Sequence, residues 1–196
     1  MTLYEQFEAE FKPHLGHTKR WEAMSFIAKE LLNTNRSINI LETGCVRKLN
    51  NWDGDGQSTL LWDWCVAKTK GVLQSYDINA DNVALARTQC TPSFSGISLG
   101  DSIKHLRIEQ NSGLVSALSL LYLDSFDYSP GRYHLAELHH IGELACVYDK
   151  LPSGCLIAVD DCHSDTFGKH VLVKAFFDRI NVQPLLKSYI TVWRKP

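Results

Sequence analysis

Acidic residues follow each of five short apolar runs in this chain, at the point where each run ends. They are Glu42, Asp77, Asp101, Asp124, and the adjacent pair Asp160 and Asp161. If the runs are parallel strands, their carboxyl ends meet at one edge of a sheet, where open α/β sheets bind their ligands. The alternative is that each acid caps the helix that follows it. The whole row favours a ligand site.

The spacing of the apolar runs predicts the elements that would position these acids. The runs are Ile38–Leu41, Val72–Tyr76, Gly96–Leu99, Ala117–Leu123 and Cys155–Val159. Helix-length segments separate them, which is typical of a parallel sheet. Residues 3–32 carry apolar side chains at helical spacing with a break near Pro13 and Gly16, and they predict an N-terminal helical cover over residues 1–35. Residues 36–196 would form the core of a single domain, closed by an antiparallel hairpin at Gln183–Trp193.

The loop after the first run, ETGCVRKLNNWDGDGQST, contains Gly44, Gly54 and Gly56 and leads into a helix that begins near Ser58 and Thr59. Its glycine spacing departs from the dinucleotide fingerprint of dehydrogenases. Amides at the start of a helix can orient a carboxylate as well as a phosphate, so a ligand that carries an amino acid fits. Asp77 stands where a ribose-binding acid belongs, the alternative being a cap for the helix Asn79–Gln89.

These motifs resemble those of the class I S-adenosylmethionine-dependent methyltransferases, from about Ile38 to Trp193. LETGC with GDGQST is similar to the glycine-rich first motif, YDIN to the ribose-binding second, GDS to the adenine-contacting third and LLYLDSFDY to the fourth. The resemblance implies a Rossmann-like fold with a mostly parallel seven-stranded sheet and helices on both faces. It also implies that S-adenosylmethionine is bound by the loop and strand ends, through Glu42, Gly44, Gly56, Ser58, Thr59, Asp77, Asp101 and Ser102.

The fourth and fifth strand ends, with Asp124, Asp160 and Asp161, resemble those of metal-dependent O-methyltransferases of the catechol and macrocin types. The consecutive pair of aspartates is closer to the macrocin type. Neighbouring strands lie ~4.8 Å apart, so the three carboxylates can surround one hard cation such as Mg²⁺. The alternative is that Asp160 caps a loop while Asp161 faces solvent.

A group that accepts a proton is expected beside the acids. His163, His134 and Asp124 are the predicted catalytic residues, because histidine titrates near neutral pH and both histidines follow strands of the crevice edge. His139 and His140 lie deeper in a helical segment, where one of them is expected to be a packing or surface residue.

The composition of the chain argues against two classes of protein, those that bind nucleic acid and those that span a membrane. A net charge of -2 and a pI near 6.4 argue against a nucleic-acid partner, and no apolar run is long enough to span a bilayer. Six cysteines without a CxxC pair, and an N-terminus unlike a signal peptide, favour a cytoplasmic protein.

The leading hypothesis is metal-assisted methylation of a hydroxyl on a small molecule such as a sugar or secondary metabolite. A metal-independent methyltransferase with a nitrogen or protein acceptor is the second hypothesis, and a non-catalytic cofactor-binding partner protein is the third. The sequence leaves the oligomeric state open, with a homo-oligomer among the alternatives.

Overall fold

A six-stranded sheet with strand order β3-β2-β1-β4-β5-β8 lies at the centre of the fold. The computed structural model describes residues 1–34 and 36–196. The sheet strands are β1 (Asn39–Thr43), β2 (Val72–Asp77), β3 (Ser95–Leu99), β4 (Leu120–Leu123), β5 (Leu156–Val159) and β8 (Thr191–Arg194). The first five pair in parallel, and β8 pairs antiparallel with β5. The five parallel strands predicted from apolar runs are confirmed, each within a few residues.

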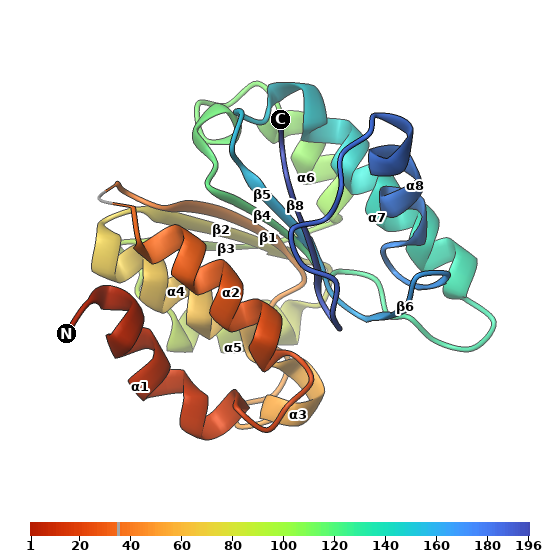
Figure 1. Cartoon of the computed structure of the whole chain (residues 1–196). Coiled ribbons are helices and arrows are strands. Elements are labelled where there is room, and N and C mark those ends of the chain that lie inside the picture. Colours follow the sequence, from red (N-terminus) through yellow and green to blue (C-terminus); the bar gives the residue numbers. More distant parts are fainter. Residues whose placement is uncertain (35) are drawn as a thin grey trace.

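Helices cover both faces of this sheet (Figure 1). They are α1 (Leu3–Leu15), α2 (Trp21–Leu32), α3 (Trp52–Asp55), α4 (Ser58–Thr69), α5 (Ala80–Gln89), α6 (Ser102–Glu109), α7 (Tyr133–Val147) and α8 (Val171–Arg179). Two short 3-10 turns lie at Val115–Ala117 and Tyr148–Lys150. Figure 1 shows α2, α4 and α5 on one side of the sheet and α6, α7 and α8 on the other, with α1 packed outside α2 and α4.

Two hydrophobic cores result, one on each face of the sheet. Successive side chains of a strand point to opposite faces, so Ile40 joins the core beneath α2 and α4 while Leu41 joins the core beneath α6 and α7. Both residues are fully buried. A strand buried on both faces is mostly apolar, which explains the continuous apolar runs of the sequence.

The N-terminal cover is confirmed as the helix pair α1 and α2. Thr2 and Glu5 form a capping box at the start of α1, which satisfies amides that the first turn leaves free. Pro13 lies inside the last turn of α1, and the chain leaves the helix at Gly16. The predicted break near these two residues is therefore correct.

The C-terminal hairpin is less regular than predicted, and it accounts for a sheet of six strands where seven were expected. Strand β8 is its second arm, but the first arm contributes only an isolated bridge between Leu186 and Val192. Pro184 has no amide hydrogen to donate, and the amides of Leu185 and Leu186 both point to the carbonyl of Val192. A regular ladder cannot form with that pattern.

A small two-stranded ribbon, β6 (Cys162–Ser164) with β7 (Phe167–Gly168), follows β5 and was not predicted. It turns the chain back toward the carboxyl ends of β4 and β5 before α8 begins. This return places residues 168–170 beside the acidic edge.

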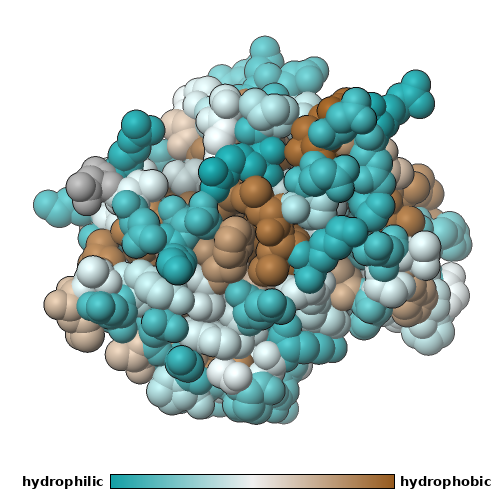
Figure 2. All heavy atoms as spheres, in the orientation of Figure 1, coloured by the Kyte–Doolittle hydropathy of each residue, from teal (hydrophilic) through white to brown (hydrophobic). Residues whose placement is uncertain are grey.

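Hydrophilic residues cover most of the face seen in Figure 2, and hydrophobic residues show there at the centre and in patches toward the upper right and the right edge. Within the described residues no helix combines the length and apolar character needed to cross a bilayer. All six cysteines are free thiols, five of them buried.

Candidate functional site

Glu42, at the end of β1, is fully buried and holds the start of α4 against the sheet. Its carboxylate accepts hydrogen bonds from Ser58 Oγ at 2.7 Å, Thr59 Oγ1 at 2.8 Å and Ser75 Oγ at 2.7 Å. Burial raises the pKa of Glu42 to about 7, and the three hydroxyl donors limit the rise. Glu42 and Thr59, both predicted to contact the cofactor, therefore lie beneath the loop and support it from below.

The loop after β1 approaches the end of β4 closely at Gly44. The residue has a left-handed backbone with φ of 81°, and a Cβ atom there would come within 2.6 Å of the carbonyl oxygen of Asp124. Only glycine tolerates both conditions. The close approach brings the loop amides to the crevice edge.

Asp77, at the end of β2, faces that loop. Its Oδ2 accepts hydrogen bonds from the Cys45 amide at 3.1 Å and from Asn82 Nδ2 at 3.2 Å, and its Oδ1 accepts one from the Asn79 amide at 2.7 Å. The cap of α5 is Asn79, whose side chain binds the amides of Asp81 and Asn82. The capping alternative for Asp77 is therefore wrong, and the carboxylate remains half-buried at the crevice.

Two adjoining pockets run along this edge of the sheet. One, of about 340 Å³, is lined by Gly44, Asp77, Asp101 and Ser102 among others. The second, of about 190 Å³, shares Gly44 and Asp77 with the first and reaches Ser58 and Asp124. The structure thus brings most of the predicted cofactor residues together in one continuous groove.

Asp101 caps a helix and also stands at the wall of a pocket. It lines the larger pocket, and its Oδ1 also caps α6 by accepting a hydrogen bond from the Lys104 amide at 2.8 Å. Ser102 Oγ lies 3.0 Å from His139 Nε2, and that ring lies 3.3 Å from Glu143 Oε1. Burial alone would lower the pKa of His139, but the hydrogen bond and charge of Glu143 outweigh it and raise the pKa.

Gly56, predicted to contact the cofactor, is not among the residues that line these two pockets. It ends α3 with a left-handed φ of 65°, and a Cβ atom there would come within 2.5 Å of Arg20 Cδ. The glycine leaves room for Arg20, whose Nη1 donates to the carbonyls of Asp53 and Gly54. The loop insertion is therefore packed around an arginine from the N-terminal helices.

Arg20 continues to the carboxylates at the end of β5. Its Nε lies 2.8 Å from Asp160 Oδ2 and its Nη2 lies 3.2 Å from Asp161 Oδ1. Asp160 is fully buried and also accepts hydrogen bonds from Tyr122 Oη at 3.0 Å and from the Asp161 amide at 2.6 Å. The Tyr189 hydroxyl donates to Asp161 Oδ1.

Lys169 enters the same cluster from the other side. Its ammonium nitrogen lies 2.6 Å from Asp124 Oδ1 and 3.0 Å from Asp161 Oδ2, and its side chain is 2% exposed. In the described part of the chain, Asp124 Oδ2 is the one carboxylate oxygen of the three aspartates that no hydrogen-bond donor reaches. Asp124 lines the smaller pocket, so this oxygen is the open position of the cluster.

The charges of the cluster set its proton affinities. Burial, together with the charges of Asp160 and Asp161, raises the pKa of Asp124 although Lys169 lowers it. Burial also acts to raise the pKa of Asp161, but Lys169, Tyr189 and Arg20 outweigh it and hold that pKa below its usual value. For Lys169, burial acts to lower the pKa, but the carboxylates of Asp124, Asp161 and Asp160 outweigh it and raise the pKa, which favours the ammonium form.

The three aspartates predicted to bind a metal do converge, but the donor set does not fit a divalent cation as it stands. Lys169 and Arg20 already occupy the oxygens that a cation would need. Among residues 1–34 and 36–196, no group of three or more His, Cys, Asp or Glu side chains is arranged to hold a metal ion.

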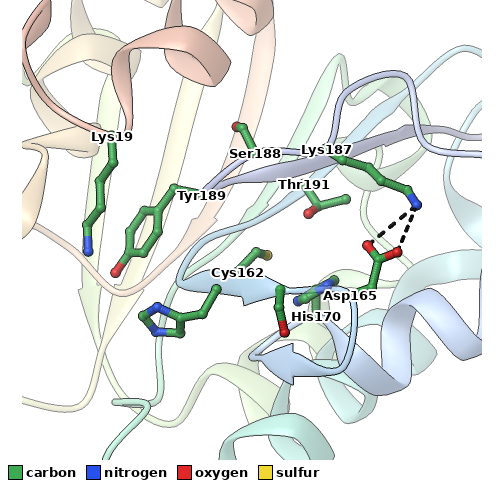
Figure 3. Close-up of a pocket in the computed structure, with 10 residues that line it drawn as sticks. Lys19, Cys162, Asp165, His170, Lys187, Ser188, Tyr189 and Thr191 are labelled. Atoms are coloured by element: carbon green, nitrogen blue, oxygen red, sulfur yellow. Dashed lines mark hydrogen bonds and ion pairs between the residues drawn. The ribbon is translucent and has the colours of Figure 1, made fainter.

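His163 lies on β6 and lines a third pocket, of about 410 Å³. Figure 3 shows this pocket with Lys19 and Tyr189 at one side. Lys19 and Tyr189 line this pocket as well as the one that contains Asp124, so the two pockets adjoin. The Lys19 ammonium lies 3.5 Å from the centroid of the Tyr189 ring. His134, by contrast, is exposed on the first turn of α7.

Sequence reasoning missed the residues that complete the site, namely Arg20, His139, Lys169 and Tyr189. His139 and Glu143 are four residues apart on one helix, a spacing at which side chains meet, so that pair could have been found. Arg20 contacts Asp160 across 140 positions, and no local pattern marks such a contact.

Comparison with known proteins gives structural matches only. No protein-family model matches this sequence, and no curated protein matches it significantly. Among solved structures, the chain is similar to the MycE methyltransferase of the mycinamycin biosynthetic pathway in complex with Mg and SAH, with a TM-score of 0.66 and 13% identity. That match covers 98% of this chain and 54% of the other, so this chain spans about half the length of that MycE chain.

Two further matches cover more of the compared proteins. CalS11, a TDP-rhamnose 3'-O-methyltransferase of calicheamicin biosynthesis, matches with a TM-score of 0.61 and 12% identity over 88% of this chain and 77% of its own. The SAH-bound Podospora anserina methyltransferase PaMTH1 matches with a TM-score of 0.61 and 15% identity over 98% and 86%. At such identities these likenesses establish the fold alone, the Rossmann-like fold of these methyltransferases.

Proposed function

We propose that this protein is an S-adenosylmethionine-dependent methyltransferase that acts on a hydroxyl group of a small molecule, such as a sugar or a secondary metabolite. The observation that carries the proposal is the continuous groove from Ser58 through Gly44 and Asp77 to Ser102, at the carboxyl edge of a methyltransferase fold. MycE and PaMTH1 were solved with SAH, and CalS11 is an O-methyltransferase.

The groove offers a suitable group for each part of the cofactor. The half-buried carboxylate of Asp77 can accept hydrogen bonds from the two ribose hydroxyls, and charge-assisted bonds of this kind are strong. Ile78 and Phe126 offer apolar surfaces for the adenine beside Asp101 and Ser102. The methionine end would then lie near Gly44 and the first turn of α4, in the smaller pocket.

The acceptor would enter from the pocket of Figure 3, past Lys19 and Tyr189, because these residues line both this pocket and the one that contains Asp124. A hydroxyl must lose its proton as its oxygen attacks the methyl group. We assign that proton to Asp124 Oδ2, the open oxygen of the acidic cluster, with His163 as the second candidate. His134, exposed on α7, receives no role in this proposal.

Metal assistance remains an untested prediction, and the ion pairs of Lys169 and Arg20 instead favour the metal-independent form of the reaction. The ammonium of Lys169 touches carboxylates from two neighbouring strands, where the sequence had predicted a cation between them. Positioning of the two substrates and removal of the proton are then the contributions of the protein.

The test is a calorimetric titration of the protein with S-adenosylmethionine and with SAH, using NAD⁺ as a control ligand of the related dinucleotide fold. We expect S-adenosylmethionine and SAH to bind and NAD⁺ not to bind. Transfer of a radioactive methyl group to a panel of sugars, nucleotide sugars and phenols then tests catalysis. Failure of the wild-type protein to bind either ligand would contradict the proposal, and binding without transfer to any acceptor would favour a non-catalytic partner protein.

A further inference from the structure

Lys169 is the feature of the acidic cluster that the proposed chemistry leaves unexplained. Its ammonium contacts Asp124 from β4 at 2.6 Å and Asp161 from β5 at 3.0 Å, with a side chain only 2% exposed. Lysine is rarely buried to this extent unless it is paired. A buried cation between carboxylates of two adjacent strands stands where a metal-dependent site would place its ion.

We infer that Lys169 replaces the divalent cation at this edge of the sheet, so that the chain itself supplies the positive charge. The exclusion of metal follows from the ion pairs alone. The role of Lys169 in methyl transfer rests on the proposed function.

The fold delivers Lys169 by a specific route. The ribbon of β6 and β7 turns back on the end of β5, and the Lys169 amide donates to the carbonyl of Asp161 at 3.2 Å. Gly168 permits this approach, because a Cβ atom there would come within 2.7 Å of the same carbonyl oxygen. The Gly168 amide also donates to Tyr128 Oη at 3.0 Å. The lysine is therefore anchored through its backbone before its side chain reaches the carboxylates.

Arg20 makes the cluster still less receptive to a metal. Three carboxylates face two cations, which leaves one negative charge in the cluster. Mg²⁺ requires near-octahedral oxygen coordination, and here both oxygens of Asp161 already bind cationic donors. An added divalent ion would have to displace at least one of the two cations and would be repelled by the other.

Within the proposed reaction Lys169 is a positioning residue that acts through Asp124. By holding Oδ1, the ammonium fixes the carboxylate with Oδ2 as its open oxygen toward the pocket. It also keeps Asp161 ionised beside Tyr189, at the passage between the two pockets. Loss of Lys169 should therefore release Asp124 and leave a carboxylate pair free to bind a hard cation.

The experiment titrates Mn²⁺ into four proteins and follows the signal of free Mn²⁺ by electron paramagnetic resonance. They are the wild type, Lys169→Ala, Lys169→Arg, and Lys174→Ala as a control that removes a lysine from α8 in a pair with Asp178. We expect wild type, Lys169→Arg and Lys174→Ala to bind Mn²⁺ no tighter than about 1 mM. Lys169→Ala should bind at least about tenfold more tightly, because it opens space and restores a hard-oxygen site.

Two results would overturn the inference. One is Mn²⁺ binding by the wild type in the micromolar range that Asp124→Asn abolishes, since this would show a metal site coexisting with Lys169. The other is a folded Lys169→Ala protein whose Mn²⁺ affinity equals that of the wild type. If Lys169→Ala does not fold, the wild-type titration with Asp124→Asn still decides the question.

The outcome is separable from that of the proposed function, because Mn²⁺ binding needs neither cofactor nor acceptor. Where methyl transfer is found, the wild-type rate should be unchanged by EDTA. A rate that EDTA abolishes and Mg²⁺ restores would contradict the inference while leaving the methyltransferase proposal intact.

Discussion

The two halves of the carboxyl edge use the same residue type in opposite ways. At the ends of β2 and β3, Asp77 and Asp101 accept hydrogen bonds from nearby amides and line an open groove. At the ends of β4 and β5, Asp124, Asp160 and Asp161 are bound by Lys169 and Arg20. Amide donors leave a carboxylate with its full charge for a ligand, whereas side-chain cations neutralise it.

This difference suggests that the two halves of the edge have different functions. In the β2–β3 half, the carboxylates keep their charge and can accept hydrogen bonds from hydroxyl or amine donors of a ligand. The β4–β5 half is a nearly neutral, tightly paired cluster with one open oxygen, suited to holding geometry and accepting a single proton. Substitution of Asp77 should therefore affect ligand binding, and substitutions in the second half should affect stability.

The largest effect is expected from Arg20→Met, which removes a buried cation and leaves Asp160 unpaired. Breaking a buried ion pair from one side costs about 3–5 kcal/mol in the free energy of unfolding. Urea denaturation of the variant, compared with the exposed control Arg107→Met, measures the loss. The double variant Arg20→Met with Asp160→Asn should recover much of it. A loss of unfolding free energy no larger than that of Arg107→Met would show that the paired cluster at β4 and β5 does not stabilise the fold.

Glu42→Gln should change how stability depends on pH. The folded-state pKa of Glu42 is about 7 against an ordinary 4.5, so the folded protein binds the extra proton between these values and loses stability as pH rises through them. Glutamine cannot ionise. The stability of the variant relative to wild type should therefore improve by about 3 kcal/mol between about pH 5 and about pH 8. Parallel pH profiles of the two proteins would contradict the assignment.

Asp77→Ala should weaken S-adenosylmethionine binding by about 2–3 kcal/mol, or roughly 30- to 150-fold, through the loss of charge-assisted hydrogen bonds to ribose. Calorimetry on this variant and on Asp81→Ala, an exposed acid on α5, gives the measurement and its control. Because Asp77→Ala also removes the acceptor of the Cys45 and Asn79 amides, the affinities are compared well below the thermal midpoint of each variant. Equal affinities for the two variants would show that Asp77 does not contact the ligand.

The smallest effect is expected from Asp101→Ala. Removing an N-cap costs about 1 kcal/mol of stability, and Asp101→Asn should retain most of it because asparagine also caps helices. Chemical denaturation of both variants makes this comparison. A loss of cofactor affinity far beyond the loss of stability would instead assign Asp101 chiefly to the ligand.

The parallel strands and the row of acids could be predicted because they depend on local periodicity and on the common edge of a parallel sheet. The loop glycines were recognised too, but the space that Gly56 leaves for Arg20 could not be predicted. The cations could not be predicted, because Lys169 and Arg20 meet their carboxylates across 45 and 140 positions. The predicted seventh strand does not form, because Pro184 lacks the amide hydrogen that a regular ladder needs.

Arg20 also has a consequence for the way the chain folds. Its partners on β5 belong to the last parallel strand of the sheet, so the pair joins regions 140 positions apart and must close a very long loop. Contacts of such separation form late and slow folding. Until the contact with Arg20 forms, the Asp160 carboxylate has no guanidinium partner, and its burial costs free energy. We therefore expect the edge formed by β5 and β8 to dock last, together with α2, so that the N-terminal helices and the C-terminal strands form one cooperative unit.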